Sequence, residues 1–282
     1  FHNRGILINR VNIFLLLLIF SICSCDRENL WEEMGNARIE LNVIYNGNGH
    51  TDGTVPKDNT IYGVSSLVTV QDNTGHLINI DGITTAYRFN GWNTKPDGSG
   101  IHYSPGDTFV FSTDDINLYA QWTPYAIGDT GPAGGWIFYD KGVYSNGWRY
   151  LEAAPIDQAK SNYGSYPFVV PGADGTAIGT GEQNTQDLIV GDSASAAAHE
   201  CYNYSVTSGN IIYDDWFLPS RDELEQMYIN LHQNGVGGFI NSLYWSSSEY
   251  AIAAAWMQHF GTGTQYNSYK SGPYCVRAIR YF

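Results

Sequence analysis

Side chains that could carry out a reaction are present in this chain, but none are spaced in a reactive pattern. The seven histidines are scattered, and no H-x-x-x-H or C-x-x-C spacing that would hold zinc occurs. No G-x-S-x-G turn and no phosphate-binding loop occurs either. A Ser-His-Asp set could be drawn from so many polar residues that its availability carries no weight. The sequence therefore predicts a protein that is not an enzyme and has no catalytic, cofactor or metal site.

Residues 260–272, which read FGTGTQYNSYKSG, are better suited to recognition than to chemistry. Tyrosine offers a large contact area at little cost in conformational entropy, while serine, glycine and asparagine adapt their hydrogen bonds to a ligand. We therefore predict a binding surface here rather than a slack connecting loop. The residues predicted to contact the ligand are His259, Gly261, Thr262, Thr264, Tyr266, Asn267, Ser268, Tyr269 and Ser271.

The composition predicts that this surface belongs to a folded, β-rich protein of about two domains. Of the 282 residues, 43% are hydrophobic and 15% are charged, which is typical of a globular chain. The 21 tyrosines, 8 tryptophans and 31 glycines favour strands and turns over a helical bundle. The formal net charge of -14 disfavours nucleic acid and other polyanions as partners.

The N-terminal residues predict export. Arg4 and Arg10 precede the apolar run VNIFLLLLIF, which is too short to span a bilayer of about 30 Å as a helix and is typical of a secretory signal peptide. Residues 22–25, ICSC, resemble the lipobox of bacterial lipoproteins. This resemblance implies a signal peptide over residues 1–24, lipid on Cys25 and a stable membrane anchor on the cell surface or outer membrane. An ordinary signal peptide with an incidental cysteine is the alternative. Residues 25–38 are polar and predict a tether.

Two further cysteines remain in the exported protein, Cys201 and Cys275. In an oxidising exterior they could form a single disulfide. Two buried free thiols are the alternative, and the sequence does not decide between them.

Residues 39–123 alternate as strands do. Leu41, Val43 and Tyr45 define one apolar face, and NGNG follows as a turn. The motifs VIYNGNG, YRFNGWNTKPDGSG, YSPGDTF and INLYAQWT then appear in order and are similar to the internalin-B-type repeat, also called the Listeria–Bacteroides repeat. The resemblance implies a small β-grasp-like module that acts as a spacer or protein contact in surface proteins, with Trp92 and Trp122 in its core.

Residues 124–282 begin with a Gly/Pro-rich linker and mix strand and helix signals. GWIFYDK and WRYLEAAP predict paired strands, and the alanine run in SASAAAHECYNY predicts a short helix. A second helix is predicted from Ser220, with an apolar stripe at Leu224, Met227, Tyr228 and Leu231. LYWSSSEY, AAWMQHF and YCVRAIRYF predict the closing strands.

GGWIFYDKG, DDWFLPSRDEL, YWSSSEY and VRAIRYF together resemble the family named for the C-terminal domain of the Legionella collagen-like protein. That family is related to the C-type-lectin-like and formylglycine-generating-enzyme-like folds. The resemblance implies a mixed α/β domain with a twisted sheet and irregular loops, so the whole chain is predicted to be α+β. The cysteine arrangement of those enzymes and the calcium-and-sugar loop of C-type lectins are absent from this sequence.

The last segment also resembles the variable proteins of diversity-generating retroelements, which use a lectin-like fold and mutate adenines in Asn-type codons. Their template keeps certain residues fixed, and this chain has the matching types at Trp256, Gln258, Phe260, Gly263, Gln265 and Lys270. The predicted contact residues between them are all types reachable from such codons, whereas Met257 is not.

The combined prediction is a lipid-anchored bacterial surface protein that binds an unknown protein or glycan through its C-terminal domain, diversified by a retroelement. The alternative is a structural envelope protein that forms homo-oligomers and has no separate ligand.

Overall fold

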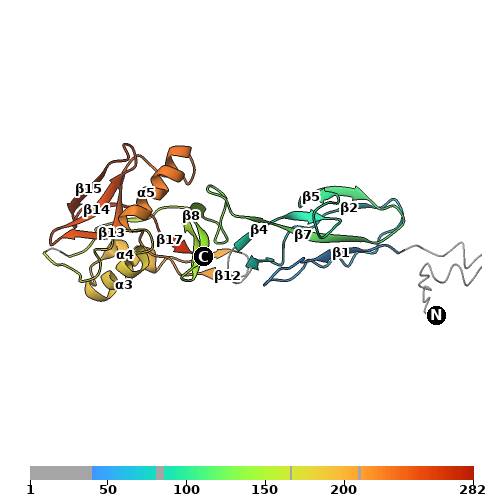
Figure 1. The fold of residues 1–282 in the computed structure, drawn as a ribbon, viewed down its shortest axis with the longest axis horizontal. Helices are drawn as coiled ribbons and strands as arrows, with labels where there is room; N and C mark the ends of the chain where they lie inside the picture. The colour runs from blue at the N-terminus through green and yellow to red at the C-terminus, as the bar shows by residue number, and fades with distance from the viewer. Residues whose placement is uncertain (1–39, 81–85, 166, 209–210) are drawn as a thin grey trace, which may run out of the picture. The chain divides into compact units, whose positions relative to one another are not determined.

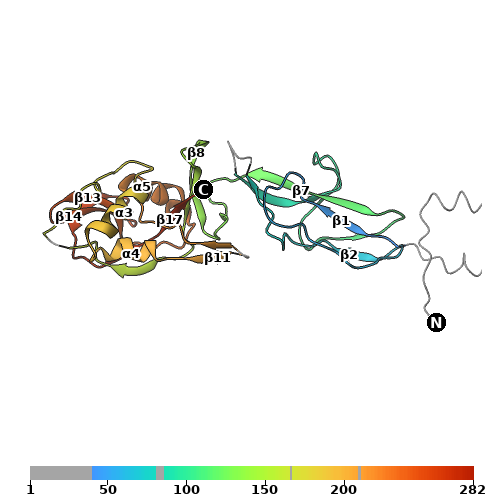
Figure 2. The same ribbon diagram turned by 90° about the horizontal axis from the view of Figure 1, so that it is seen from below.

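The computed structural model describes residues 40–80, 86–165, 167–208 and 211–282, which fold into two compact units (Figures 1 and 2). The first unit holds the described residues up to Leu77 together with Phe89–Trp122, and the second holds Ile78–Arg88 and Thr123–Phe282. Helices and strands are both present, with strands predominating, as expected for an α+β chain. Cys25, the predicted signal peptide and the predicted tether lie outside the described residues.

A mixed sheet with strand order β1-β7-β4-β3 organises the first part of the chain. β1 runs parallel to β7, β5 pairs with β4, and a separate two-stranded sheet joins β2 to β6. The strands are β1 (Val43–Asn46), β2 (Leu67–Thr69), β3 (Asn79–Ile80), β4 (Ala86–Asn93), β5 (His102–Tyr103), β6 (Thr108–Val110) and β7 (Ile116–Pro124).

The core of the first unit follows from strand alternation. Leu41, Val43 and Tyr45 are buried, because side chains two apart in a strand point to the same face. Trp92 is fully buried and its indole N–H donates to the Gln71 carbonyl at 2.9 Å, so the prediction of a core tryptophan is confirmed. Trp122 is only partly buried and packs against this core.

Two sheets organise the second unit. One has the strand order β17-β9-β8, and the other, which we call the central sheet, has the order β10-β16-β13-β14-β15. β11 and β12 form a separate hairpin. The strands are β8 (Trp136–Ser145), β9 (Trp148–Ala153), β10 (Gln158–Ser161), β11 (Val206–Ser208), β12 (Ile211–Tyr213), β13 (Leu243–Ala251), β14 (Ala254–His259), β15 (Gln265–Tyr269), β16 (Tyr274–Val276) and β17 (Ile279–Tyr281).

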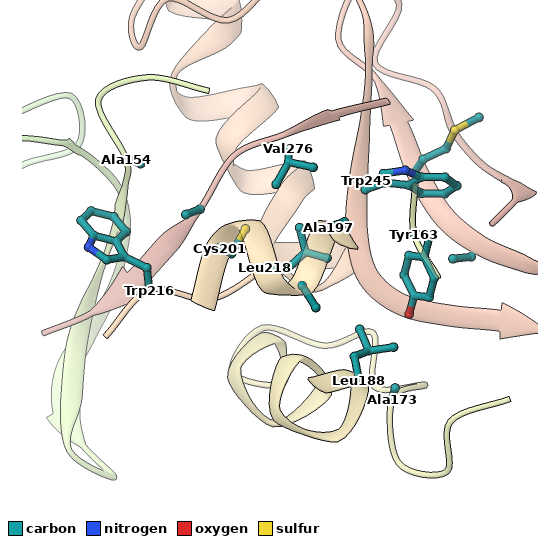
Figure 3. Close-up of a cluster of buried hydrophobic side chains, with 14 of the residues drawn as sticks. Ala154, Tyr163, Ala173, Leu188, Ala197, Cys201, Trp216, Leu218, Trp245 and Val276 are labelled. Atoms are coloured by element: carbon teal, nitrogen blue, oxygen red, sulfur yellow. The ribbon is translucent and has the colours of Figure 1, made fainter. Parts of the chain in front are cut away.

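Helices cover both faces of the central sheet. α3 (Gly181–Gly191) and α4 (Ala196–Tyr202) contribute to one hydrophobic cluster with Trp245 (Figure 3). α5 (Arg221–Asn230), which is followed by a short 3-10 helix at His232–Asn234, contributes to another cluster with Tyr244. Neighbouring residues of one strand point to opposite faces, so the two clusters lie on the two sides of the sheet.

The tentative disulfide between Cys201 and Cys275 is not formed. Both are buried free thiols, and they belong to different clusters, Cys201 with α4 and Cys275 beside Tyr244. The sheet therefore separates them. Burial raises the pKa of the Cys201 thiol well above its ordinary value, and the nearby Glu200 carboxylate adds to this effect.

The predicted helix start at Ser220 is confirmed in detail. The Ser220 hydroxyl accepts from the Glu223 backbone N–H, and the Glu223 carboxylate accepts from the Ser220 N–H at 2.7 Å, which is a capping box. Trp216 and Leu218, just before it, are buried as predicted.

Candidate ligand-binding surface

The stretch predicted to bind a ligand contains a turn, the strand β15 and a second turn. β15 pairs antiparallel with β14, with Gln265 opposite Gln258 and Tyr269 opposite Ala254, and it lies at one edge of the central sheet. This strand was not predicted from the sequence. We call residues 259–271, which comprise β15 and the turns on either side of it, the hairpin surface.

Phe260 and Gln258 hold the hairpin to the body of the second unit. The Phe260 ring is buried and its centroid lies 4.4 Å from that of Tyr244 and 5.1 Å from that of Phe239. The Gln258 side chain is buried and donates to the Glu225 carboxylate on α5. Neither side chain is available to a ligand.

Lys270 fixes the far end of β15 by a buried ion pair. Its side chain is 1% exposed, and its ammonium donates to Glu249 Oε1 at 2.6 Å and to the Phe168 carbonyl. The second oxygen of the Glu249 carboxylate accepts from the Val170 N–H at 3.0 Å. One lysine therefore joins the end of β15 to β13 and to the loop around residue 168.

Two further residues set the shape of the turn before β15 and the path of the strand. Gly263 has a φ of 74° and lies against Tyr228, so that a Cβ there would come within 2.6 Å of the tyrosine ring. The Gln265 side chain donates to the Arg221 carbonyl at 2.9 Å. The turn thus has a backbone conformation that strongly favours glycine.

The predicted contact residues occupy the remaining positions and are exposed or half-buried. Tyr269 is 73% exposed and Tyr266 is 37% exposed. His259 and Ser268 are half-buried; His259 Nδ1 accepts from the Gly261 N–H, and the Ser268 hydroxyl lies 3.2 Å from that of Tyr274. The other exposed members are Gly261, Thr262, Thr264, Asn267 and Ser271.

These residues do not all share one face. Residues opposite each other in an antiparallel pair point the same way, so Asn267 lies on the face of Trp256 and Tyr266 on that of Met257. Tyr269, two residues after Asn267, shares its face. A pocket of about 300 Å³ lies beside Tyr269 and is lined also by Ala253, Lys270 and Ser271. The hairpin surface is therefore an edge with two sides rather than a flat patch.

One aromatic neighbour of this surface, Tyr250, was not singled out from the sequence. Tyr250 is 55% exposed, and its ring centroid lies 5.1 Å from that of the half-buried Trp256. The Arg221 guanidinium lies 5.2 Å from the same tryptophan ring. The signal that could have found Tyr250 is the β13–β14 hairpin, because it places Tyr250 near Trp256.

Three consecutive serines of β13 have structural roles. Ser246, Ser247 and Ser248 are buried in β13, and the hydroxyls of Ser246 and Ser248 donate to backbone carbonyls. Within the described ranges, no three His, Cys, Asp or Glu side chains come together as a metal site would require.

The terminal arginines are also structural. Arg277 is buried and pairs with Asp157 at 2.6 Å, and Arg280 pairs with Asp215 at 2.7 Å and with the fully buried Glu152 at 3.2 Å. Burial raises the pKa of Glu152, against the opposing effect of the Arg280 charge and two backbone N–H donors. These pairs join the last strands to the body of the second unit.

A larger groove of about 580 Å³ lies away from the hairpin surface. It runs between the segment around β10 and α4 and is lined by Asp157, His199 and Glu200 among others. The Asp157 carboxylate is engaged by Arg277 and by the Tyr244 hydroxyl at 2.8 Å. None of the predicted contact residues lines this groove.

Comparison with known proteins gives short matches. No family model matches the chain. A protein of Evansella cellulosilytica named "Putative Gly-rich membrane protein" is 44% identical over 83 residues, which are 29% of this chain and 9% of that protein. Another protein of the same organism, named "Putative membrane protein", is 39% identical over 80 residues, 28% of this chain and 11% of that protein.

This chain is thus similar, over less than a third of its length, to proteins that are named membrane proteins, and its match spans about a tenth of their length. Among the residues that the structure describes, no helix has the length and apolar character needed to cross a membrane.

Proposed function

We propose that this protein binds a macromolecular ligand through the hairpin surface, at equilibrium and without chemistry. The observation that carries the proposal is the division of this segment into two sets of residues. Gln258, Phe260 and Lys270 are buried in ring contacts, hydrogen bonds and an ion pair, while the exposed positions between them carry tyrosine and small polar side chains. Such a set offers contact area on a rigid support.

The same division supports diversification of the segment by a retroelement. Three of the six residues at the fixed places of the template, Gln258, Phe260 and Lys270, are buried, and the predicted contact residues are exposed or half-buried. Met257, which does not fit the pattern of reachable residues, is 7% exposed and packs in the core. A varied residue there would disturb packing, so we place the variable region from His259 onward.

We also propose that the chain is a surface lipoprotein anchored through Cys25. In this proposal, residues 39–123 form the internalin-B-type spacer, and residues 124–282 form the lectin-like domain that presents the hairpin surface. The names of the two matched proteins support an association with a membrane.

The test measures binding of the full chain to protein and glycan arrays. Tyr269→Ala and Tyr266→Ala are expected to weaken any binding by roughly tenfold each, as exposed aromatic anchors do. Tyr202→Ala is the matched control, because Tyr202 is a 54% exposed tyrosine on α4 and outside the hairpin surface. Equal effects of all three substitutions, or no ligand on either array, would count against the proposal.

A further inference from the structure

We propose that the free edge of β15 pairs, main chain to main chain, with an extended cationic segment of a partner protein. The inference rests on the proposed function and narrows its ligand to a protein. It depends on three features: the direction of the β15 backbone groups, the lack of charge, proline or bulge in β15 itself, and the net charge of the chain.

The hydrogen bonds of the hairpin show which backbone groups face outward. The His259 N–H donates to the Thr264 carbonyl and the Lys270 N–H donates to the Ala253 carbonyl, both at 3.0 Å. In an antiparallel ladder the bonded residues alternate, so the backbone groups of Tyr266 and Ser268 face β14. The N–H groups of Gln265, Asn267 and Tyr269 therefore point away from the sheet. The carbonyls of Gln265 and Asn267 do the same, whereas the Tyr269 carbonyl accepts from the Gly272 N–H.

Within the part of the chain that the structure describes, β15 carries none of three common devices that protect sheet edges from other chains. Proteins guard an edge with charged side chains, proline or a bulge. At the opposite edge of the central sheet, β10 carries the exposed Lys160 and a register shift between Gln158 and Ser161. The five residues of β15 are uncharged and in continuous register, and the neighbouring Lys270 is buried in its ion pair. Of the two edges, as far as the structure describes them, β15 is the one without charge, proline or bulge.

Side chains beside the edge could contact the side chains of an added strand and so discriminate between sequences. A strand bound at an edge presents alternate side chains to the two faces of the sheet. Tyr269 and the pocket of about 300 Å³ flank one end of β15, and Tyr266 lies on the opposite face. Main-chain bonds would supply affinity and these tyrosines would supply specificity.

Charge favours a cationic partner over a second copy of this chain. The formal net charge is -14, so two copies repel each other at long range. Two cations beside the hairpin are compensated, Arg221 by Asp222 at 2.7 Å and Lys270 by Glu249. A segment rich in lysine or arginine would be attracted to this chain and would meet no exposed, unpaired cation on β15.

The test compares two substitutions at one residue of the full chain. Asn267→Pro removes an outward N–H and leaves the bonds to β14 in place, since proline is tolerated where the N–H faces solvent. Asn267→Thr removes the same side chain but keeps the N–H. The probe is a series of short synthetic peptides of high strand propensity whose net charge runs from negative to positive.

Binding is expected to strengthen with positive peptide charge, to fall about tenfold or more in Asn267→Pro, and to change less than about threefold in Asn267→Thr. Amide hydrogen exchange in the unsubstituted chain gives a readout that does not depend on either variant. The amides of Gln265, Asn267 and Tyr269 should exchange more slowly when the peptide is bound.

Three outcomes would overturn the inference. One is that no peptide of the series binds or slows these amides. Another is that the two substitutions weaken binding equally, which would assign recognition to side chains and leave the proposed function standing. The last is a dimer of the chain alone that Asn267→Pro dissociates, because the occupant of the edge would then be a second copy. Loss of array binding in Tyr269→Ala, by contrast, tests the proposed function alone.

Discussion

Lys270 lies in a stretch of mostly exposed residues, yet its charge is out of contact with water. The ammonium donates to two acceptors, the Glu249 carboxylate and the Phe168 carbonyl. Removing water from two charges costs several kcal/mol, and their attraction offsets this only when the geometry is good. The pair therefore serves to fix the end of β15 more than to add stability.

This leads to a prediction about single and double substitutions. Lys270→Met leaves the Glu249 carboxylate buried without its cation, and we expect it to lower the free energy of unfolding by about 3–5 kcal/mol. Adding Glu249→Gln should recover most of that loss, because glutamine is neutral and still accepts from Val170. Urea unfolding of the two variants checks this. If the double variant is as unstable as the single one, the ion pair is not the cause.

For individual residues, burial could be predicted from the sequence in some cases and not in others. Trp92, Trp216 and Leu218 could be predicted as core because large apolar side chains are rarely left in water. The bonding state of the cysteines could not be predicted from the sequence, because a bond between Cys201 and Cys275 depends on the distance between segments far apart in the chain. The partners of Arg277 and Arg280 also depend on long-range placement.

At the scale of elements, β15 was missed because its side chains give no apolar alternation. Its residues are exposed or half-buried, and the strand is held by backbone bonds to β14 and by anchors outside it. α3 was missed for a related reason. Its buried side chains include Asn184 and Thr185 beside Leu188, and Ile189 is only partly buried against the same cluster, so the apolar helical period is weak. α5, with its capping box and apolar stripe, was predictable from local signals.

The turn between α3 and α4 carries a prediction about pH. The Asp192 carboxylate accepts from the Ser165 N–H, from the Ser165 hydroxyl at 2.7 Å and from the Ala194 N–H at 3.0 Å. Burial alone would raise the pKa of Asp192, but these hydrogen bonds and the charge of Lys270 lower it below its ordinary value.

A carboxyl group with a lowered pKa in the folded state stabilises the fold above the unfolded pKa, and that contribution is lost as the pH falls through the folded pKa. We therefore expect the unfolding free energy to decrease below a pH of about 4, in part through Asp192. Asp192→Asn should be less stable at neutral pH and should show a shallower decline in acid. Parallel urea titrations across this pH range measure both quantities. An unchanged slope in Asp192→Asn would assign the acid sensitivity to other carboxyls.

At the scale of the whole molecule, the two units have separate cores. Every residue of the Trp92 cluster lies in the first unit, and the clusters around Trp245 and Tyr244 lie in the second. Composition could predict about two domains, since it reflects how much apolar surface the chain can bury. It could not predict that Ile78–Arg88 groups with the second unit, because that depends on contacts rather than on sequence order.

The proposed membrane anchor leads to a prediction about the N-terminus of the mature protein. In bacteria that process lipoproteins, the mature protein should begin at an acylated Cys25 and should partition with membranes. Mass spectrometry of the intact N-terminus tests this directly. Cys25→Ala should abolish both properties, whereas Cys23→Ala, two residues earlier, should retain them. An unmodified Cys25 in the membrane-extracted protein would remove the proposed anchor.

The arrangement of the hairpin has a consequence for how this protein can change over generations. The backbone bonds between β14 and β15 do not depend on side-chain type, and the anchors Gln258, Phe260 and Lys270 lie outside the exposed set. New side chains at exposed positions can therefore be accepted without refolding the sheet. Under the proposed diversification, many ligand specificities could be explored at these positions while each variant still folds.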